Sequence, residues 1–167
     1  MSIYLTGSIA FDYLMSFPGY FKDHILPEHL ESISLSFLVD DMVRRPGGVA
    51  ANIAYTLGLL CEHPKLVATA GVDFTEYRQS LESAGVDTSG VRIIEDKFTA
   101  SFFVNTDRSN AQIASFYAGA MADAAIISMH GLGLTAEDIV VISPNAPDAM
   151  VKYAQECQDL NVPYIFE

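Results

Sequence analysis

The 167-residue sequence predicts an α/β protein with a doubly wound parallel sheet and a small β-sheet lid. Short apolar runs alternate with stretches whose apolar residues recur at helical spacing, which is typical of parallel sheets with helices on their faces. Two hairpin-like regions do not fit this alternation. The predicted α/β core is therefore 1–12, 46–97 and 119–167, and the predicted lid is 13–45 and 98–118.

The first elements follow from short patterns. Ile3–Leu5 is an apolar run that predicts a buried strand. In Ile33–Val39 the odd positions are apolar, which predicts a strand with one covered face that ends at Arg44–Gly48. From Val49 to Leu60 the apolar spacing predicts a helix. Leu66–Ala70 predicts another buried strand.

The later elements continue the same alternation. In order, we expect a helix at Tyr77–Ser83, a strand at 91–95, a helix end near Ala120–Ala125, strands at Ile126–Ser128 and Ile139–Ser143, a helix at Asp148–Leu160 and a strand at Val162–Phe166. Gly85 is a helix C-terminal signal, and Asp148 suits the dipole of a helix N-terminus.

Residues Phe98–Thr106 and Gln112–Tyr117 predict a hairpin with its loop centred near Ser109. This register places Phe102 opposite Phe116 on one face. Two aromatic rings on the inner face of a lid can hold a flat base by stacking, which contributes ~1–3 kcal/mol per base. The alternative is a cross-strand pair inside the lid's own small core.

The charge of −12 and the nine scattered basic residues argue against a nucleic-acid partner, since phosphate binding needs clustered Lys and Arg. No apolar run approaches the ~20 residues that span a bilayer, and Met1–Gly7 lacks the basic region and the cleavage site typical of a signal peptide. The four histidines show no metal-ligand spacing, so we expect no metal site. These features predict a cytoplasmic protein that binds neither nucleic acid nor membrane.

Four polar or flexible residues are candidates for binding. Asp12 follows the first strand at the edge where open α/β sheets bind ligands, although it can equally be an Asx-turn residue. Gly47 and Gly48 permit close backbone approach and can form a hinge, or simply a loop. Asn52, in the first turns of the next helix, can donate to and accept from a sugar diol.

Several blocks resemble a known family. Gly7–Asp12 and Gly47–Asn52 resemble two signatures of the ribokinase (PfkB) family, and Ala70–Phe74 resembles its next block. More narrowly, Phe17–Gly19, Leu26–Leu30, Ser34–Asp41 and Ala111–Tyr117 are similar to actinobacterial adenosine kinases. The resemblance covers essentially all 167 residues.

The resemblance implies a ribokinase-like fold and ATP-dependent phosphorylation of the 5′-hydroxyl of adenosine, with Mg²⁺ and ATP. It implies that Asp12 binds the ribose hydroxyls with Gly48 and Asn52. It further implies that Ser8 and Ser36 line the nucleoside site and that Phe102 and Phe116 sandwich the adenine. Gly47 and Gly48 would form a hinge. A homodimer through the lid strands is also implied.

The family's catalytic aspartate lies in a Gly-Ala-Gly-Asp-like motif, which this sequence lacks. We therefore expect the catalytic aspartate and the ATP-binding half outside these residues, in a truncated chain that is inactive alone. Ala118 and Ser101 depart from the proline and the basic residue expected near the lid. A ribokinase-type sugar kinase and a non-catalytic nucleoside-binding or dimerising fragment remain alternatives, although the paired phenylalanines favour a base over a bare sugar.

Overall fold

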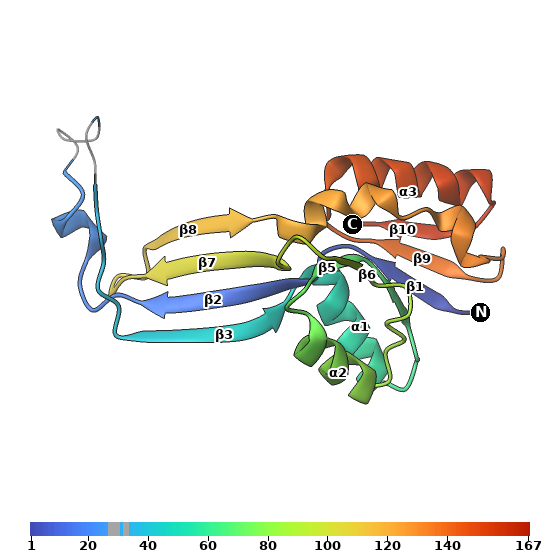
Figure 1. The fold of residues 1–167 in the computed structure, drawn as a ribbon, viewed down its shortest axis with the longest axis horizontal. Coiled ribbons are helices and arrows are strands. Elements are labelled where there is room, and N and C mark those ends of the chain that lie inside the picture. Colours follow the sequence, from blue (N-terminus) through green and yellow to red (C-terminus); the bar gives the residue numbers. More distant parts are fainter. Residues whose placement is uncertain (27–30, 32–33) are drawn as a thin grey trace. The chain divides into compact units, whose positions relative to one another are not determined.

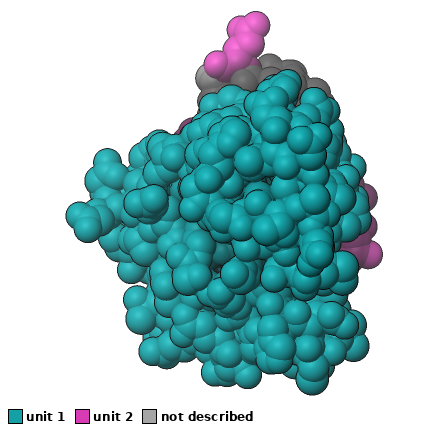
Figure 2. All heavy atoms as spheres, turned by 90° about the vertical axis from the view of Figure 1, so that its right-hand side faces the viewer, with its two compact units in different colours: residues 1–10, 46–100, 118–167 teal, residues 11–45, 101–117 magenta. Residues whose placement is uncertain are grey.

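The computed structural model describes residues 1–26, 31 and 34–167. These residues form two compact units, which Figure 2 colours separately. Unit 1 contains Met1–Ala10, Pro46–Ala100 and Ala118–Glu167, and unit 2 contains Phe11–Arg45 and Ser101–Tyr117. The chain passes between the units after Ala10, Arg45, Ala100 and Tyr117.

Unit 1 is built on parallel strands (Figure 1). Its main sheet has four strands in the order β10-β9-β1-β4. The strands are β1 (Ile3–Thr6), β4 (Lys65–Val67), β9 (Ile139–Ile142) and β10 (Tyr164–Phe166). A second, two-stranded parallel sheet pairs β5 (Thr69–Gly71) with β6 (Arg92–Ile94). The predicted run at Leu66–Ala70 is thus two strands, separated at Ala68.

Helices cover both sides of the main sheet (Figure 1). On one side lie α1 (Val49–Leu59) and α2 (Thr75–Ser83), and on the other lies α3 (Pro147–Asp159) with the 3-10 helices η3 (Gly119–Ile126) and η4 (Met129–Leu132). The predicted doubly wound arrangement is confirmed. No helix among the described residues is long and apolar enough to cross a membrane.

The strand alternation sends side chains into two apolar layers. Tyr4 pairs with Val140, and both belong to the cluster that packs against Tyr153 and Cys157 of α3. The next residue, Leu5, points to the other side and is fully buried. The α1 alanines at 50, 51 and 54 are also fully buried, since small side chains allow a helix to approach closely.

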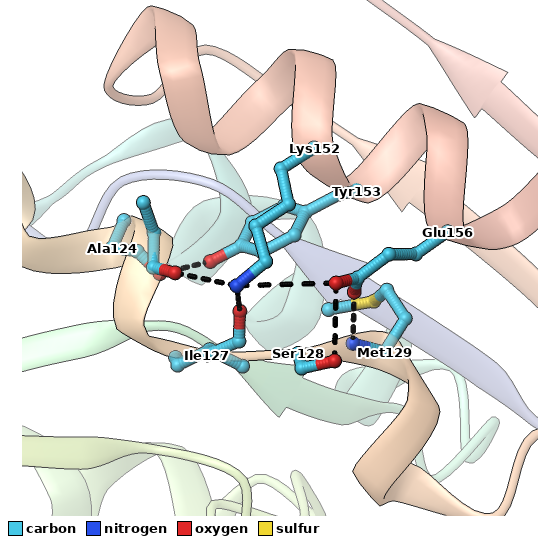
Figure 3. A network of polar contacts seen from close by, with 8 residues as sticks. Ala124, Ile127, Ser128, Met129, Lys152, Tyr153 and Glu156 are labelled. Atoms are coloured by element: carbon cyan, nitrogen blue, oxygen red, sulfur yellow. Dashed lines mark hydrogen bonds and ion pairs between the residues drawn. The ribbon is translucent and has the colours of Figure 1, made fainter.

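The strand predicted at Ile126–Ser128 is wrong. Ile126 ends η3, and the backbone that follows is held by side chains of α3 (Figure 3). Lys152 Nζ donates to the carbonyl of Ile127 (2.8 Å), and Glu156 accepts a hydrogen bond from the N–H of Met129 (2.6 Å). These side chains satisfy backbone groups that would otherwise need a neighbouring strand.

Unit 2 contains most of a four-stranded sheet in the order β3-β2-β7-β8. The strands are β2 (Ala10–Ser16), β3 (Asp41–Gly47), β7 (Ala100–Thr106) and β8 (Gln112–Tyr117), and a short 3-10 helix, η1, covers Phe21–Asp23. The predicted hairpin register is confirmed, with Phe102 opposite Phe116 and Thr106 opposite Gln112.

The strand predicted at Ile33–Val39 is wrong within the described residues. Ile33 lies outside them, as do residues 27–30 of the similar block, and residues 34–39 form no strand. The strand follows instead as β3 and includes the two arginines expected to end it. Phe37 packs edge-on against Phe17 and Phe21, with ring centroids 5.0 and 4.9 Å apart. Phe37 therefore packs in an aromatic cluster and not on a strand face, whereas Leu35 and Leu38 are exposed.

Candidate functional site

The predicted residues of unit 1 gather at the N-terminus of α1, next to the carboxyl end of β1. Ser8 Oγ accepts a hydrogen bond from the N–H of Val49 (2.9 Å), and the N–H of Ser8 donates to the carbonyl of Pro144 (3.0 Å). Ser8 therefore joins the ends of β1 and β9 to the start of α1. This edge of a parallel sheet is where α/β folds bind ligands.

Gly48 begins α1 with φ +92° and ψ 134°, a conformation that side-chain-bearing residues rarely adopt. A Cβ at this position would lie 2.5 Å from the Ser8 carbonyl oxygen and 2.7 Å from the Ala10 nitrogen. Only glycine lets the backbone pass this close to the chain after β1. The fold therefore requires glycine at position 48, whether or not this residue also contacts a ligand.

Asn52 lies one turn into α1, where its N–H donates to the Gly48 carbonyl (2.9 Å). Its side chain is exposed and makes no hydrogen bond with a described residue. Ser8, Gly48 and Asn52 are therefore brought together by the first turn of one helix. The Asn52 amide keeps its full donor and acceptor capacity for a ligand.

Two further polar groups lie at the same edge and were not singled out from the sequence. Ser143, directly after β9, is fully buried, and neither its Oγ nor the buried Nδ2 of Asn145 has a hydrogen-bond partner among the described residues. Buried polar groups in folded proteins are normally paired. A serine and an asparagine after a strand are common turn residues, so the sequence carried no signal that distinguished them.

Asp12 lies inside β2, so the Asx-turn alternative is wrong. Its side chain is half-buried, and desolvation raises the pKa of the Asp12 carboxyl above its ordinary value. Ser36 is exposed and belongs to the segment that forms no strand. Both residues belong to unit 2.

Phe102 and Phe116 form a cross-strand pair in the hairpin of unit 2. Phe116 is 53% exposed, Phe102 is half-buried, and neither ring makes an aromatic contact with a described residue. On the opposite face, Phe103 stacks on Tyr13 with centroids 4.6 Å apart. Unit 2 thus contains one stacked aromatic pair, Tyr13 and Phe103, and one cross-strand pair, Phe102 and Phe116, whose rings contact no other ring of a described residue.

Two side chains anchor the backbone close to the unit boundaries, and sequence patterns did not reveal them. Tyr77 on α2 donates from its hydroxyl to the Gly47 carbonyl (2.9 Å). Asp73 accepts from the N–H (2.8 Å) and the hydroxyl (2.7 Å) of Thr99, just before β7. Asp73 was part of a recognised block, but its partner lies 26 residues away, and no local pattern indicates such a bond.

The described cavities lie elsewhere. One of about 520 Å³ in unit 1 is lined by residues 89–92, 126–128, 131 and 132, and one of about 360 Å³ in unit 2 is lined mainly by residues 16–18 and 106–108. Neither contains a predicted site residue. The described residues contain no group of three or more His, Cys, Asp or Glu side chains that could hold a metal ion.

Comparisons with known proteins bear on the family and the fold of the chain. The profile of the pfkB carbohydrate kinase family matches residues 20–166. A nucleoside kinase of Methanothermobacter thermautotrophicus is 35% identical over 116 residues, which are 68% of this chain and 34% of that protein. The nucleoside kinase of Burkholderia thailandensis, solved in complex with inosine, has 34% identity and a TM-score of 0.79 over 99% of this chain and 52% of that chain.

The nucleoside kinase of Methanocaldococcus jannaschii shares the fold, with a TM-score of 0.81 at 23% identity over 99% of this chain and 52% of that chain. This chain therefore spans about half the length of the solved structures it matches. The family match extends over most of the sequence, and the fold is ribokinase-like. The chain belongs to the pfkB family of carbohydrate kinases.

Proposed function

We propose that this chain supplies the nucleoside-binding part and the lid of a kinase that transfers phosphate from ATP to the 5′-hydroxyl of adenosine. The Phe102–Phe116 pair is the observation that favours a nucleoside over a bare sugar as the substrate. Its rings have no aromatic partner among the described residues, and a base has a flat face on which such rings stack. The likeness to a nucleoside kinase solved with inosine supports a nucleoside substrate.

The proposed roles follow the chemistry of each group. Asp12, when ionised, accepts hydrogen bonds from the ribose hydroxyls, and Asn52 and the Gly48 backbone complete the polar contacts. Ser8 and Ser36 line the nucleoside site. Phe102 and Phe116 hold the adenine between them. The Gly47–Gly48 pair acts as the hinge, and closure of the lid excludes water from the transferred group.

Phosphoryl transfer itself needs groups that this chain does not offer. Catalysis depends on a base that positions the attacking hydroxyl and on charge stabilisation of the transferred group. The sequence has no Gly-Ala-Gly-Asp-like motif, and we expect the ATP-binding half outside these residues. We therefore expect these 167 residues to bind nucleoside without phosphorylating it.

Calorimetry with adenosine, inosine and ribose tests the proposal. Binding of both nucleosides with much weaker binding of ribose supports it. Binding of ribose with no gain from the base would instead favour a ribokinase-type sugar kinase. A folded chain that binds none of the three contradicts the assignment of the nucleoside site to these residues, and turnover of adenosine with ATP contradicts the expected inactivity.

We also propose that two copies associate through the lid. All six residues of β8 are exposed, and this strand is the edge of its sheet. Edge strands with apolar side chains are templates for pairing with another chain. Sedimentation should show a dimer that Ile113→Lys dissociates, whereas Ile126→Lys, an exposed isoleucine of unit 1, should leave it intact. Equal behaviour of the two variants would refute a lid interface.

A further inference from the structure

Tyr77 occupies a position that no family signature assigned to the site. It lies on α2, is 5% exposed, and donates its hydroxyl hydrogen to the Gly47 carbonyl at 2.9 Å. Its ring packs edge-on against the buried ring of Phe74, with centroids 5.6 Å apart. The Tyr77 ring thus packs against the N-cap residue of α2, while its hydroxyl binds the Gly47 carbonyl.

The Gly47 carbonyl oxygen, which Tyr77 binds, is part of the backbone next to the proposed site. The Gly47 carbonyl and the Gly48 N–H belong to one planar peptide unit, so fixing the carbonyl also fixes the direction of the N–H. Glycine restrains its own backbone less than any other residue, and two glycines follow each other here. Without the phenol, this peptide unit has greater freedom to rotate.

Rotation of the Gly47–Gly48 peptide would also affect the start of α1. Gly48 is the N-cap of the helix, and its carbonyl accepts the first hydrogen bond from the N–H of Asn52. The Val49 N–H is held by Ser8 Oγ. Rotation of the Gly47–Gly48 peptide therefore disturbs the groups proposed to contact the sugar.

We propose that Tyr77 is a positioning residue of the nucleoside site: its hydroxyl sets the Gly47–Gly48 peptide and thereby orients Gly48 and Asn52 for the substrate. The proposal rests on the proposed function. It differs from a purely structural role, in which the phenol would stabilise unit 1 and leave the affinity for nucleoside unchanged.

The chain offers a matched control. Tyr153 of α3 also donates its hydroxyl to a backbone carbonyl, that of Ala124 (Figure 3). It is fully buried, and its bond joins α3 to η3, away from the helix that carries Gly48 and Asn52. Tyr77→Phe and Tyr153→Phe each delete the hydrogen bond from a buried phenol to a backbone carbonyl and keep the ring.

Both variants are compared with the wild type by calorimetry with adenosine and by amide hydrogen exchange. We expect Tyr77→Phe to weaken adenosine binding by about three- to tenfold, the equivalent of one lost hydrogen bond. Exchange of the Val49 and Asn52 amides should accelerate in this variant alone. Tyr153→Phe should leave the affinity and these two amides unchanged, although it lowers the melting temperature comparably.

Wild-type affinity and wild-type exchange in Tyr77→Phe would overturn the proposal. Equal weakening of binding by the two variants would also overturn it, because the effect would then be general destabilisation. An unfolded Tyr77→Phe variant would overturn it too, by showing that the phenol is required for folding. A wild-type chain that binds no adenosine would contradict the proposed function, whereas unchanged exchange with weakened binding would contradict only the role of Tyr77.

Discussion

Replacement of Gly48 by alanine tests whether the junction between β3 and α1 requires glycine. The new Cβ would lie 2.5 Å from the Ser8 carbonyl oxygen, 2.7 Å from the Ala10 nitrogen and 2.8 Å from the Ile9 Cα. All three atoms belong to the backbone, so no flexible side chain can move aside. Overpacking of this kind costs about 1–3 kcal/mol.

The backbone conformation adds to this steric term. At φ +92° and ψ 134° an alanine is strained by about 1–3 kcal/mol even in open space. The two contributions together predict that Gly48→Ala lowers the free energy of unfolding by about 2–6 kcal/mol. That is a large fraction of the stability of an ordinary domain, which is about 5–15 kcal/mol.

Gly133 separates the two contributions. Its φ is +67°, yet a Cβ there meets nothing within 4 Å. Gly133→Ala should therefore show only the conformational cost, about 1–2 kcal/mol. Equilibrium urea unfolding of both variants measures the difference. If Gly48→Ala destabilises the chain no more than Gly133→Ala, the backbone crowding around Gly48 is not rigid and the reasoning fails.

Three further predictions concern single side chains. Asp12→Asn should raise the melting temperature at neutral pH, because desolvation raises the pKa of the Asp12 carboxyl. This gain should vanish as the pH falls through the raised pKa to the ordinary value of 3.8, and a gain that persists in acid would refute this cause. Phe116→Ala should weaken adenosine binding by about 1–3 kcal/mol and leave ribose binding unchanged. Phe103 lies on the other face of the lid, so Phe103→Ala should change the affinities for adenosine and ribose equally. Hydrogen bonds from Thr135 lower the pKa of the Asp138 carboxyl. The stability advantage of the wild type over Asp138→Asn should therefore be complete above pH 3.8 and disappear as the pH falls through the lowered pKa. Urea unfolding at several pH values measures this advantage, and an advantage that does not change with pH would argue against these hydrogen bonds as the cause.

The sequence determined the features that depend on local spacing. Helical periodicity placed α1, period-two alternation and a polar loop fixed the pairing of Phe102 with Phe116, and buried apolar runs gave the parallel strands. The blocks around Gly48 and Asn52 indicated the family, and the family match confirms it. These features could be predicted because each is set by residues close together in the chain.

Tertiary structure decided the rest, because the partners lie far apart in the sequence. The strand expected at Ile126–Ser128 is absent because Lys152 and Glu156 bind that backbone from α3. Phe37, before β3, packs against Phe17 and Phe21 in an aromatic cluster. The hydrogen bond from Tyr77 to Gly47 spans 30 residues. Periodicity reports which face of an element is apolar, but only the folded chain decides which distant group reaches it.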